Sequence, residues 1–220
     1  MLNKLRNELN LMLKHSWQWL YGIIIYITLT CVMYWVLEAI NPTLWLQIAP
    51  ATTFLLATIS LLLNLQTGFL FDTQYDAINL WCLRGFSLLE FVSIRLILIY
   101  LFISLPISTA SIFIGIILHL PFLYSVHFFF VWSLASWVMI GLGVIIAAIT
   151  PILRIRSNLL ALINIPLYIP IILFSIGAIY HYQQQEPYMF ELYMLKGLAL
   201  FGVILFPCLL KTAIKIGVDS

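Results

Sequence analysis

Two aspartates with helical spacing are the residues in this sequence that most resemble a metal-binding pair. Asp72 and Asp76 are four residues apart, which places both carboxylates on one face of a helix. Such a pair suits Mg²⁺ in a membrane-embedded prenyl transferase. Enzymes of that class need a second acidic cluster, and no other acidic pair is expected on the same side of the membrane. We therefore interpret Asp72 and Asp76 as helix-start acids or partner contacts, with the transferase as the less favoured alternative.

Nucleophilic and nucleotide chemistry have weaker signals. Gly85-Phe86-Ser87 contains a serine near a glycine, but the second glycine of a nucleophile elbow is missing and no apparent histidine base is expected on the same side. A phosphate-binding loop needs Gly-Lys-Ser/Thr, and no lysine in this chain follows a glycine. The sequence therefore predicts that this chain is not an enzyme and hydrolyses no ATP itself.

Histidines and cysteines, which ligate heme iron and transition metals, form no clear site. The histidines are His15, His119, His127 and His181. The last three are expected towards the outer face, where heme or metal ligation is chemically feasible, but interfacial histidines are more common than ligands. The cysteines, Cys31, Cys82 and Cys208, lack metal-ligand spacing and are interpreted as apolar packing residues. We predict no metal site and no cofactor bound by this chain.

Prolines and small residues in the apolar segments indicate helix bending and helix packing rather than catalysis. Pro166 and Pro170 fall within one predicted span, where each removes a backbone hydrogen bond and should kink or break the helix. Broken helices in membranes need protein or a cavity to satisfy the freed carbonyls, so this segment is either a moving or packed element or a plain structural kink. Gly141, Gly143 and Ala147 form a small-residue stripe in the preceding span that suits close helix packing.

The composition requires a membrane around these residues. Apolar residues make up 64% of the 220 residues and charged residues 8%, with a mean hydropathy of +1.10. A soluble domain carries about 25% charged residues, because polar surface must cover its core. Most of this chain's surface must therefore face a lipid bilayer, which excludes a soluble enzyme and a nucleic-acid-binding protein.

Six apolar segments are long enough to be transmembrane helices, since a helix needs about 20 residues to cross the hydrocarbon. The expected spans cover residues 17–40, 48–71, 91–114, 126–150, 158–180 and 193–210. Residues 1–16, with leucines at helical spacing opposite basic residues, are expected to form an amphipathic helix on the membrane surface. The chain, residues 1–220, is thus predicted to be one all-α integral membrane domain.

The distribution of Lys and Arg orients these helices. With the N-terminus in the cytoplasm, nine of the ten basic residues lie on the cytoplasmic side and only Lys196 lies near the outer face, so both termini are expected to be cytoplasmic. The longest cytoplasmic connection, residues 72–90, begins with two aspartates, and Arg84 closes its apolar stretch. This charge order suits the dipole of a short surface helix. We expect part of that helix, which includes Trp81, to be available to a partner.

This arrangement resembles the membrane subunit of a type-2 ABC exporter, and particular residues narrow the resemblance. Leu46-Gln47-Ile48-Ala49-Pro50 opens the second span, Phe71-Asp72 enters the cytoplasmic loop, and Pro166-Leu167-Tyr168-Ile169-Pro170 lies in the fifth span. Over nearly the whole chain the sequence is similar to the heme exporter protein B family, the B subunits of cytochrome c maturation. The family's Asp-Gly-x-Leu-Glu stretch is replaced here by Tyr75-Asp76-Ala77-Ile78-Asn79, which lacks the glycine and the glutamate.

The resemblance implies a subunit of the bacterial inner membrane that pairs with itself and with two copies of a cytoplasmic ATPase. It further implies a heme-handling C subunit, a small D subunit and a periplasmic heme chaperone as partners. The implied function is heme export and delivery to the periplasm, with release of the loaded chaperone, in c-type cytochrome biogenesis. The alternative is an ABC permease for another substrate, such as a lipid or a glycan.

The resemblance also implies roles for two groups of residues. The loop containing Asp72, Asp76, Trp81 and Arg84 would receive the motion of the ATPase, and the kinked fifth span would transmit it. Release of the chaperone is favoured over passage of heme through this chain, because the sequence has no tryptophan-rich heme motif and no evident pair of axial ligands within the membrane.

Overall fold

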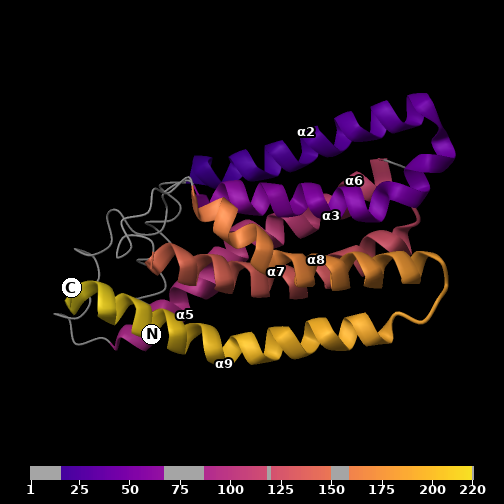
Figure 1. Ribbon diagram of the computed structural model, residues 1–220. Coiled ribbons are helices and arrows are strands. Elements are labelled where there is room, and N and C mark those ends of the chain that lie inside the picture. The colour runs from indigo at the N-terminus through magenta and orange to yellow at the C-terminus, as the bar shows by residue number, and fades with distance from the viewer. Residues whose placement is uncertain (1–15, 67–86, 118–119, 150–158, 220) are drawn as a thin grey trace.

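Helices form all the regular structure in residues 16–66, 87–117, 120–149 and 159–219, which are the residues that the computed structural model describes (Figure 1). The elements are α2 (Ser16–Ile40), α3 (Pro42–Gln66), α5 (Leu88–Ile99), the π-helical segment η1 (Tyr100–Ser104), α6 (Leu105–Ile117), α7 (Phe122–Ile149), α8 (Leu159–Gln183) and α9 (Met189–Asp219). A helix satisfies the N–H and C=O groups of its own backbone, which is what lipid requires of a spanning segment.

Six helical stretches in the described part of the chain are long and apolar enough to cross a membrane. They cover Tyr21–Ile40, Gln47–Leu65, Leu89–Ile117, Phe122–Ala148, Leu162–Gln183 and Met189–Ala213, and the third joins α5, η1 and α6. These stretches confirm the prediction of an all-α protein with six membrane-spanning helices. The start of α2 and the end of α9 lie at the same end of the bundle, and the α8–α9 connection lies at the other (Figure 1).

The first turn of the chain between spans is tighter than the sequence suggested. Asn41 is the only residue between α2 and α3, and its N–H donates to the Leu37 carbonyl at 2.9 Å. Pro42 begins α3, six residues before the expected start of the second span. Proline is favoured at the first helical position, where its missing N–H has no helical partner to lose. The Asn41-Pro42 pair therefore ends one helix and begins the next.

Ser87, considered above as a nucleophile, caps a helix. Its hydroxyl oxygen accepts a hydrogen bond from the N–H of Glu90 at 3.3 Å, and its backbone is extended, with φ −71° and ψ 138°. A serine followed three residues later by a glutamate is the sequence pattern of a capping box. The role of Ser87 is therefore to cap the start of α5, and this role explains the serine without a histidine base beside it.

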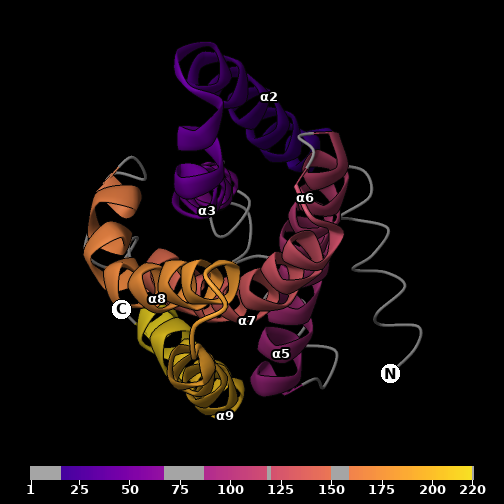
Figure 2. The same cartoon turned by 90° about the vertical axis from the view of Figure 1, so that its right-hand side faces the viewer.

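α7 is the central helix of the bundle. It packs against α3, α5, η1, α6, α8 and α9. Seen along the bundle, α2 and α3 lie on one side of α7 and α9 on the other (Figure 2). Aromatic rings fill the contact between α3 and α7, where Phe54 meets Trp132 edge to face at a centroid distance of 5.3 Å and Phe128 at 6.1 Å.

A proline explains the π-helical segment in the third span. Pro106 has no N–H to donate to the turn before it, and its ring crowds that turn. The backbone widens there, and the Leu105 N–H bonds to the carbonyl of Tyr100, five residues back. Such π-turns occur mostly within α-helices and often at functional positions. This one changes the direction in which Tyr100 leaves the helix.

α2 is held to α3 at a glycine. Ser60 donates its hydroxyl proton to the Gly22 carbonyl at 2.5 Å, and Asn64 lies one turn further along α3. A methyl group added at Gly22 would come within 1.5 Å of the Asn64 side-chain nitrogen. Only a residue without a side chain allows this approach. Away from this contact α2 is mostly open to lipid, and Trp35 exposes 75% of its surface.

We expect Gly22→Val to separate α2 from α3 and to lower the melting temperature of the purified protein. Overpacking a close contact costs about 1–3 kcal/mol. Thermal stability is measured by size-exclusion chromatography of heated detergent samples. The control is Gly197→Val in α9, where an added methyl group meets nothing within 4 Å. Equal shifts in the two variants would contradict the proposed role of the Gly22 contact.

Candidate functional site

The small-residue stripe of α7 lies in two helix contacts. A methyl group added at Gly141 would come within 2.0 Å of the Phe206 ring of α9. At Gly143 it would come within 2.7 Å of the Tyr168 hydroxyl of α8 and within 2.8 Å of a methyl group of Leu65 in α3. Ala147 is also buried. The stripe therefore brings three other helices close to α7.

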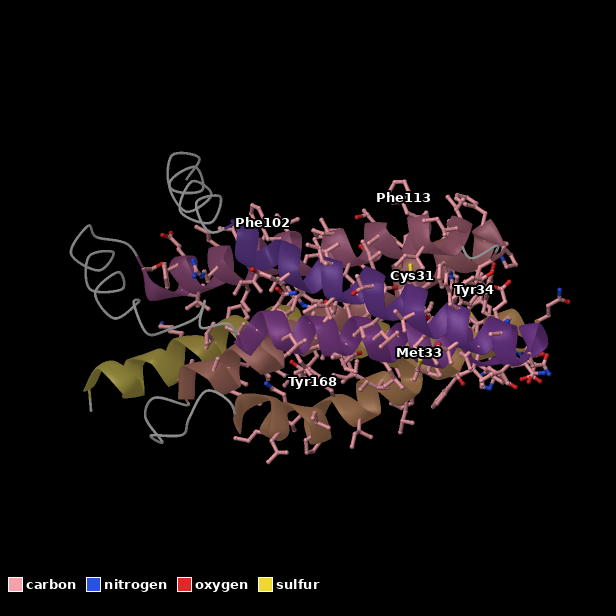
Figure 3. The ribbon with its side chains drawn as sticks, turned by 90° about the horizontal axis from the view of Figure 1, so that it is seen from above. Cys31, Met33, Tyr34, Phe102, Phe113 and Tyr168 are labelled. Carbon is pink, nitrogen blue, oxygen red and sulfur yellow. The ribbon has the colours of Figure 1, made fainter. Side chains whose placement is uncertain are left out.

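The proline segment of α8 is anchored by one tyrosine. α8 continues through Pro166 and Pro170, and its axis changes direction after its first turns (Figure 1). Tyr168 lies between the two prolines, is fully buried, and donates its hydroxyl proton to the Met139 carbonyl of α7 at 2.6 Å. Figure 3 shows the contrast with Phe113, which projects from the outside of α6.

The rest of the proline segment faces outward. Leu167 and Ile169, on either side of Tyr168, expose 45% and 49% of their surfaces. Asn164, one turn before Tyr168, is buried. No donor among the described residues makes a hydrogen bond to its side-chain oxygen. Each proline removes one backbone hydrogen bond from the helix. The segment therefore combines a helix weakened by two prolines with a polar attachment of Tyr168 to α7.

Two histidines meet a polar cluster at the end of the bundle where α8 and α9 are joined. His127 of α7 stacks on Tyr182 at a centroid distance of 4.0 Å and meets Tyr188 edge to face at 5.0 Å. His181 Nδ1 lies 2.9 Å from Glu191 Oε1, and His181 Nε2 lies 3.9 Å from Glu186 Oε2. These contacts fix the short α8–α9 connection.

Both histidines make contacts within the protein. His127 Nε2 lies 3.3 Å from the Ala178 carbonyl, and both nitrogens of His181 face carboxylates. Within the described residues no group of three or more His, Cys, Asp or Glu side chains is placed to hold a metal ion. Cys31 and Cys208 are free thiols. The cluster is suited to holding two helices together.

Several predicted site residues lie outside the described residues. They are Asp72, Asp76, Trp81 and Arg84 of the cytoplasmic loop, together with Cys82, His15 and His119, and the expected surface helices over residues 1–16 and 72–90 fall almost entirely there.

Sequence reasoning missed the polar contacts that cross between spans. Ser104 and Ser136 join η1 to α7 at 2.5 Å, and Tyr100 bonds to Ser133 one turn away. Serines spaced three apart in an apolar span, as Ser133 and Ser136 are, were the available signal, since polar side chains in lipid need partners inside the protein. The partners of these serines could not be predicted from the sequence, because the direction of the Tyr100 side chain depends on the π-turn.

We expect Tyr168→Phe to loosen α8. Removing the hydroxyl deletes the bond to Met139, which is worth about 1 kcal/mol, or somewhat less in a membrane. Hydrogen–deuterium exchange of detergent-solubilised protein should rise in peptides that contain Pro166–Pro170. Tyr180→Phe on the same helix is the control, because Tyr180 is more exposed and makes a ring contact with His181 in place of a cross-helix hydrogen bond. Unchanged exchange in Tyr168→Phe would contradict the anchoring role.

Comparison with known proteins places this arrangement in a family. The family model of the CcmB protein matches residues 1–217. The heme exporter protein B of Pseudomonas aeruginosa is 27% identical over 173 residues, which are 79% of this chain and 78% of that protein. The heme exporter protein B of Paracoccus denitrificans is 28% identical over 176 residues, 77% of this chain and 78% of that protein. With six membrane-spanning helices and a family match over almost its whole length, this chain belongs to the CcmB protein family.

Proposed function

We propose that this chain is the membrane subunit of an ABC exporter complex that serves heme delivery to the periplasm in c-type cytochrome biogenesis. The observation that carries the proposal is the family match over residues 1–217, together with two relatives named heme exporter protein B.

The proposed location is the bacterial inner membrane with both termini in the cytoplasm. Nine of the ten Lys and Arg residues fall on one side in this topology. The six spans support it, because an even number returns the chain to the side where it entered. The α8–α9 connection, with Glu186 and Glu191, then faces the periplasm, where the loaded heme chaperone would be released.

The proposed coupling path has two parts. The cytoplasmic loop with Asp72, Asp76, Trp81 and Arg84 contacts one of two copies of a separate ATPase, and a second copy of this chain completes the transporter. α8 then carries the motion along the bundle. The proline segment around Tyr168 supports this assignment, because a helix with two interior prolines changes shape at lower cost than α7.

Partners shift such a segment only if they bind its two conformations with different affinities. ATP-bound ATPase would favour one arrangement of the loop, and the C subunit, the D subunit and the heme chaperone would favour one arrangement of the opposite end. The Tyr168–Met139 hydrogen bond and the contact of Gly143 with Tyr168 lie between these ends. These two contacts would be present in one conformation and broken in the other, and this change would link ATP hydrolysis to chaperone release.

Deleting the gene should abolish heme-stained c-type cytochromes and leave other exported lipids and glycans unchanged. The measurement is heme staining of membrane and periplasmic fractions, with the gene returned on a plasmid as the control. Normal cytochromes together with an altered lipid or glycan would instead identify a permease for another substrate.

Replacing both loop acids, Asp72→Asn with Asp76→Asn, should weaken the ATPase contact without abolishing function. Exposed carboxylate contacts are worth up to about 1 kcal/mol each, so the two changes reduce association by at most about thirty-fold. Co-purification in mild detergent with quantitative mass spectrometry measures the ATPase retained, and Glu186→Gln at the opposite end is the control. Complete loss of activity with full retention of the ATPase would favour a metal-dependent transferase.

A further inference from the structure

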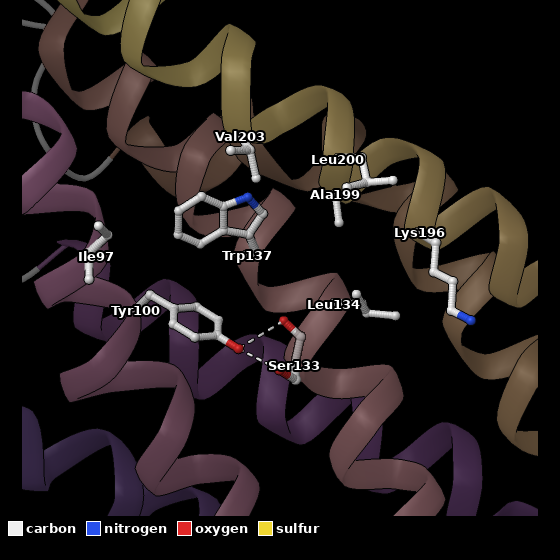
Figure 4. Close-up of a pocket in the computed structure, with 9 residues that line it drawn as sticks. All are labelled: Ile97, Tyr100, Ser133, Leu134, Trp137, Lys196, Ala199, Leu200 and Val203. Carbon is white, nitrogen blue, oxygen red and sulfur yellow. Dashed lines mark hydrogen bonds between the residues drawn. The ribbon is translucent and has the colours of Figure 1, made fainter. Parts of the chain in front are cut away.

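A groove opens sideways from the bundle between the α5–η1 span, α7 and α9 (Figure 4). Its volume is about 560 Å³, within the range of ligand pockets. Ile97 lies towards one end and Lys196 lies at the other, with the Tyr100 and Trp137 rings between them (Figure 4). Val203 and Leu200 of α9 form the facing wall.

The wall between the two ends is apolar. Tyr100 and Trp137 meet edge to face at a centroid distance of 5.5 Å, and the Tyr100 hydroxyl is bonded to Ser133. Ile97, Leu200 and Val203 are all exposed along the groove. The hydroxyl groups of Tyr100 and Ser133 are thus hydrogen-bonded to each other. A molecule bound in the groove would contact mainly aliphatic side chains and aromatic rings.

A single cation stands at one end. Lys196 is exposed, and the contact that the described residues give its ammonium group is with the Tyr193 ring, 5.7 Å from the nitrogen to the centroid. It lies seven residues after the start of α9, about 10 Å from the α8–α9 connection. At that depth a lysine extends its ammonium group to the level of the lipid headgroups.

We propose that this groove binds one phospholipid, whose phosphate pairs with Lys196 and whose acyl chain lies along Leu200, Val203 and the Trp137 ring. The stretch from Lys196 to Val203 fits within one leaflet, since it spans about 10 Å of helix and one leaflet of hydrocarbon is about 15 Å thick. The charge agrees as well, because an anionic group and a hydrocarbon chain in this order match the cation and the apolar wall. The proposal is independent of the cargo proposed above.

Heme fits the groove less well than a lipid. Heme would find no histidine, methionine or cysteine among the groove residues, and the Tyr100 oxygen is engaged with Ser133. A lipid needs no such ligand and enters from the bilayer through the open side.

The test uses the full chain, purified with its partners and placed in nanodiscs that contain a phospholipid with a photoreactive diazirine in its acyl chain. Cross-linked peptides are identified and quantified by mass spectrometry. We expect cross-links concentrated on the peptides of Trp137 and Val203. Lys196→Ala should reduce these cross-links about five-fold, because one basic residue near the membrane surface strengthens the binding of an anionic lipid by about that factor. Lys211→Ala, in the same helix and away from the groove, is the control and should leave them unchanged.

A second pair of variants separates the groove from the general lipid surface. Val203→Trp fills the groove and should abolish the cross-links to Trp137, whereas Ile204→Trp adds the same ring on the neighbouring exposed position and should not. Thermal melting confirms that each variant is folded.

Three outcomes overturn the proposal. Labelling spread evenly over α9 and insensitive to both substitutions means ordinary boundary lipid. A groove protected from the lipid probe in the purified complex means that a partner helix covers it. Heme absorbance that co-purifies with the complex and disappears in Val203→Trp means that heme occupies the groove.

Discussion

Lipid offers no hydrogen bonds, and this constraint determines how polar groups are used throughout the bundle. Every span is a helix because a helix bonds its own backbone. Hydroxyl groups inside the spans follow the same rule at short range: Thr30 donates to Tyr26 at 2.7 Å and Ser175 to Ile171 at 2.7 Å, each one turn back on its own helix. The hydroxyl groups that instead cross to another helix are the ones that specify how the helices sit together. Tyr168 is the clearest of these, because it is the polar attachment of the proline segment to α7.

The same constraint divides the helices into a rigid centre and more adaptable edges. Lipid competes with protein for apolar surface, so close packing between spans depends on small residues that let backbones approach. α7 supplies Gly141 and Gly143 and is surrounded by other helices. α2 has its close contact at Gly22 and is mostly open elsewhere, and α8 is attached to α7 by the Tyr168 hydroxyl within a segment weakened by two prolines. The transmission of motion that we propose for this subunit would use this contrast, because a uniformly packed bundle moves only as one body.

The number and type of spans were predictable from the sequence because lipid selects for long apolar runs, and composition alone required a membrane. Which face of each span meets protein was not predictable. Outward-facing Leu167 and Ile169 are as apolar as buried Ile171, so no hydrophobic periodicity separates lipid-facing from protein-facing positions. The small-residue stripe and the prolines were recognisable because their physical effects are local. The bond of Tyr100 to Ser133 was not, because it depends on a π-turn that Pro106 imposes several residues away. The roles of Asp72 and Arg84 remain predictions, since they depend on a partner's surface.

The chemistry at the α8–α9 end bears on how such a subunit could serve heme without holding it. His127 and His181 are the described histidines, and each is already engaged with a carbonyl or with carboxylates. Recruiting either as an iron ligand would cost these contacts, and the connection between α8 and α9 would lose what orders it. In the mechanism that we propose, the energy of ATP hydrolysis by a partner would move the proline segment of α8, and this movement would displace that connection and any partner bound there. Under this proposal the subunit would act on the release of a loaded partner through its own change of shape, and heme would remain with proteins that offer it a ligand.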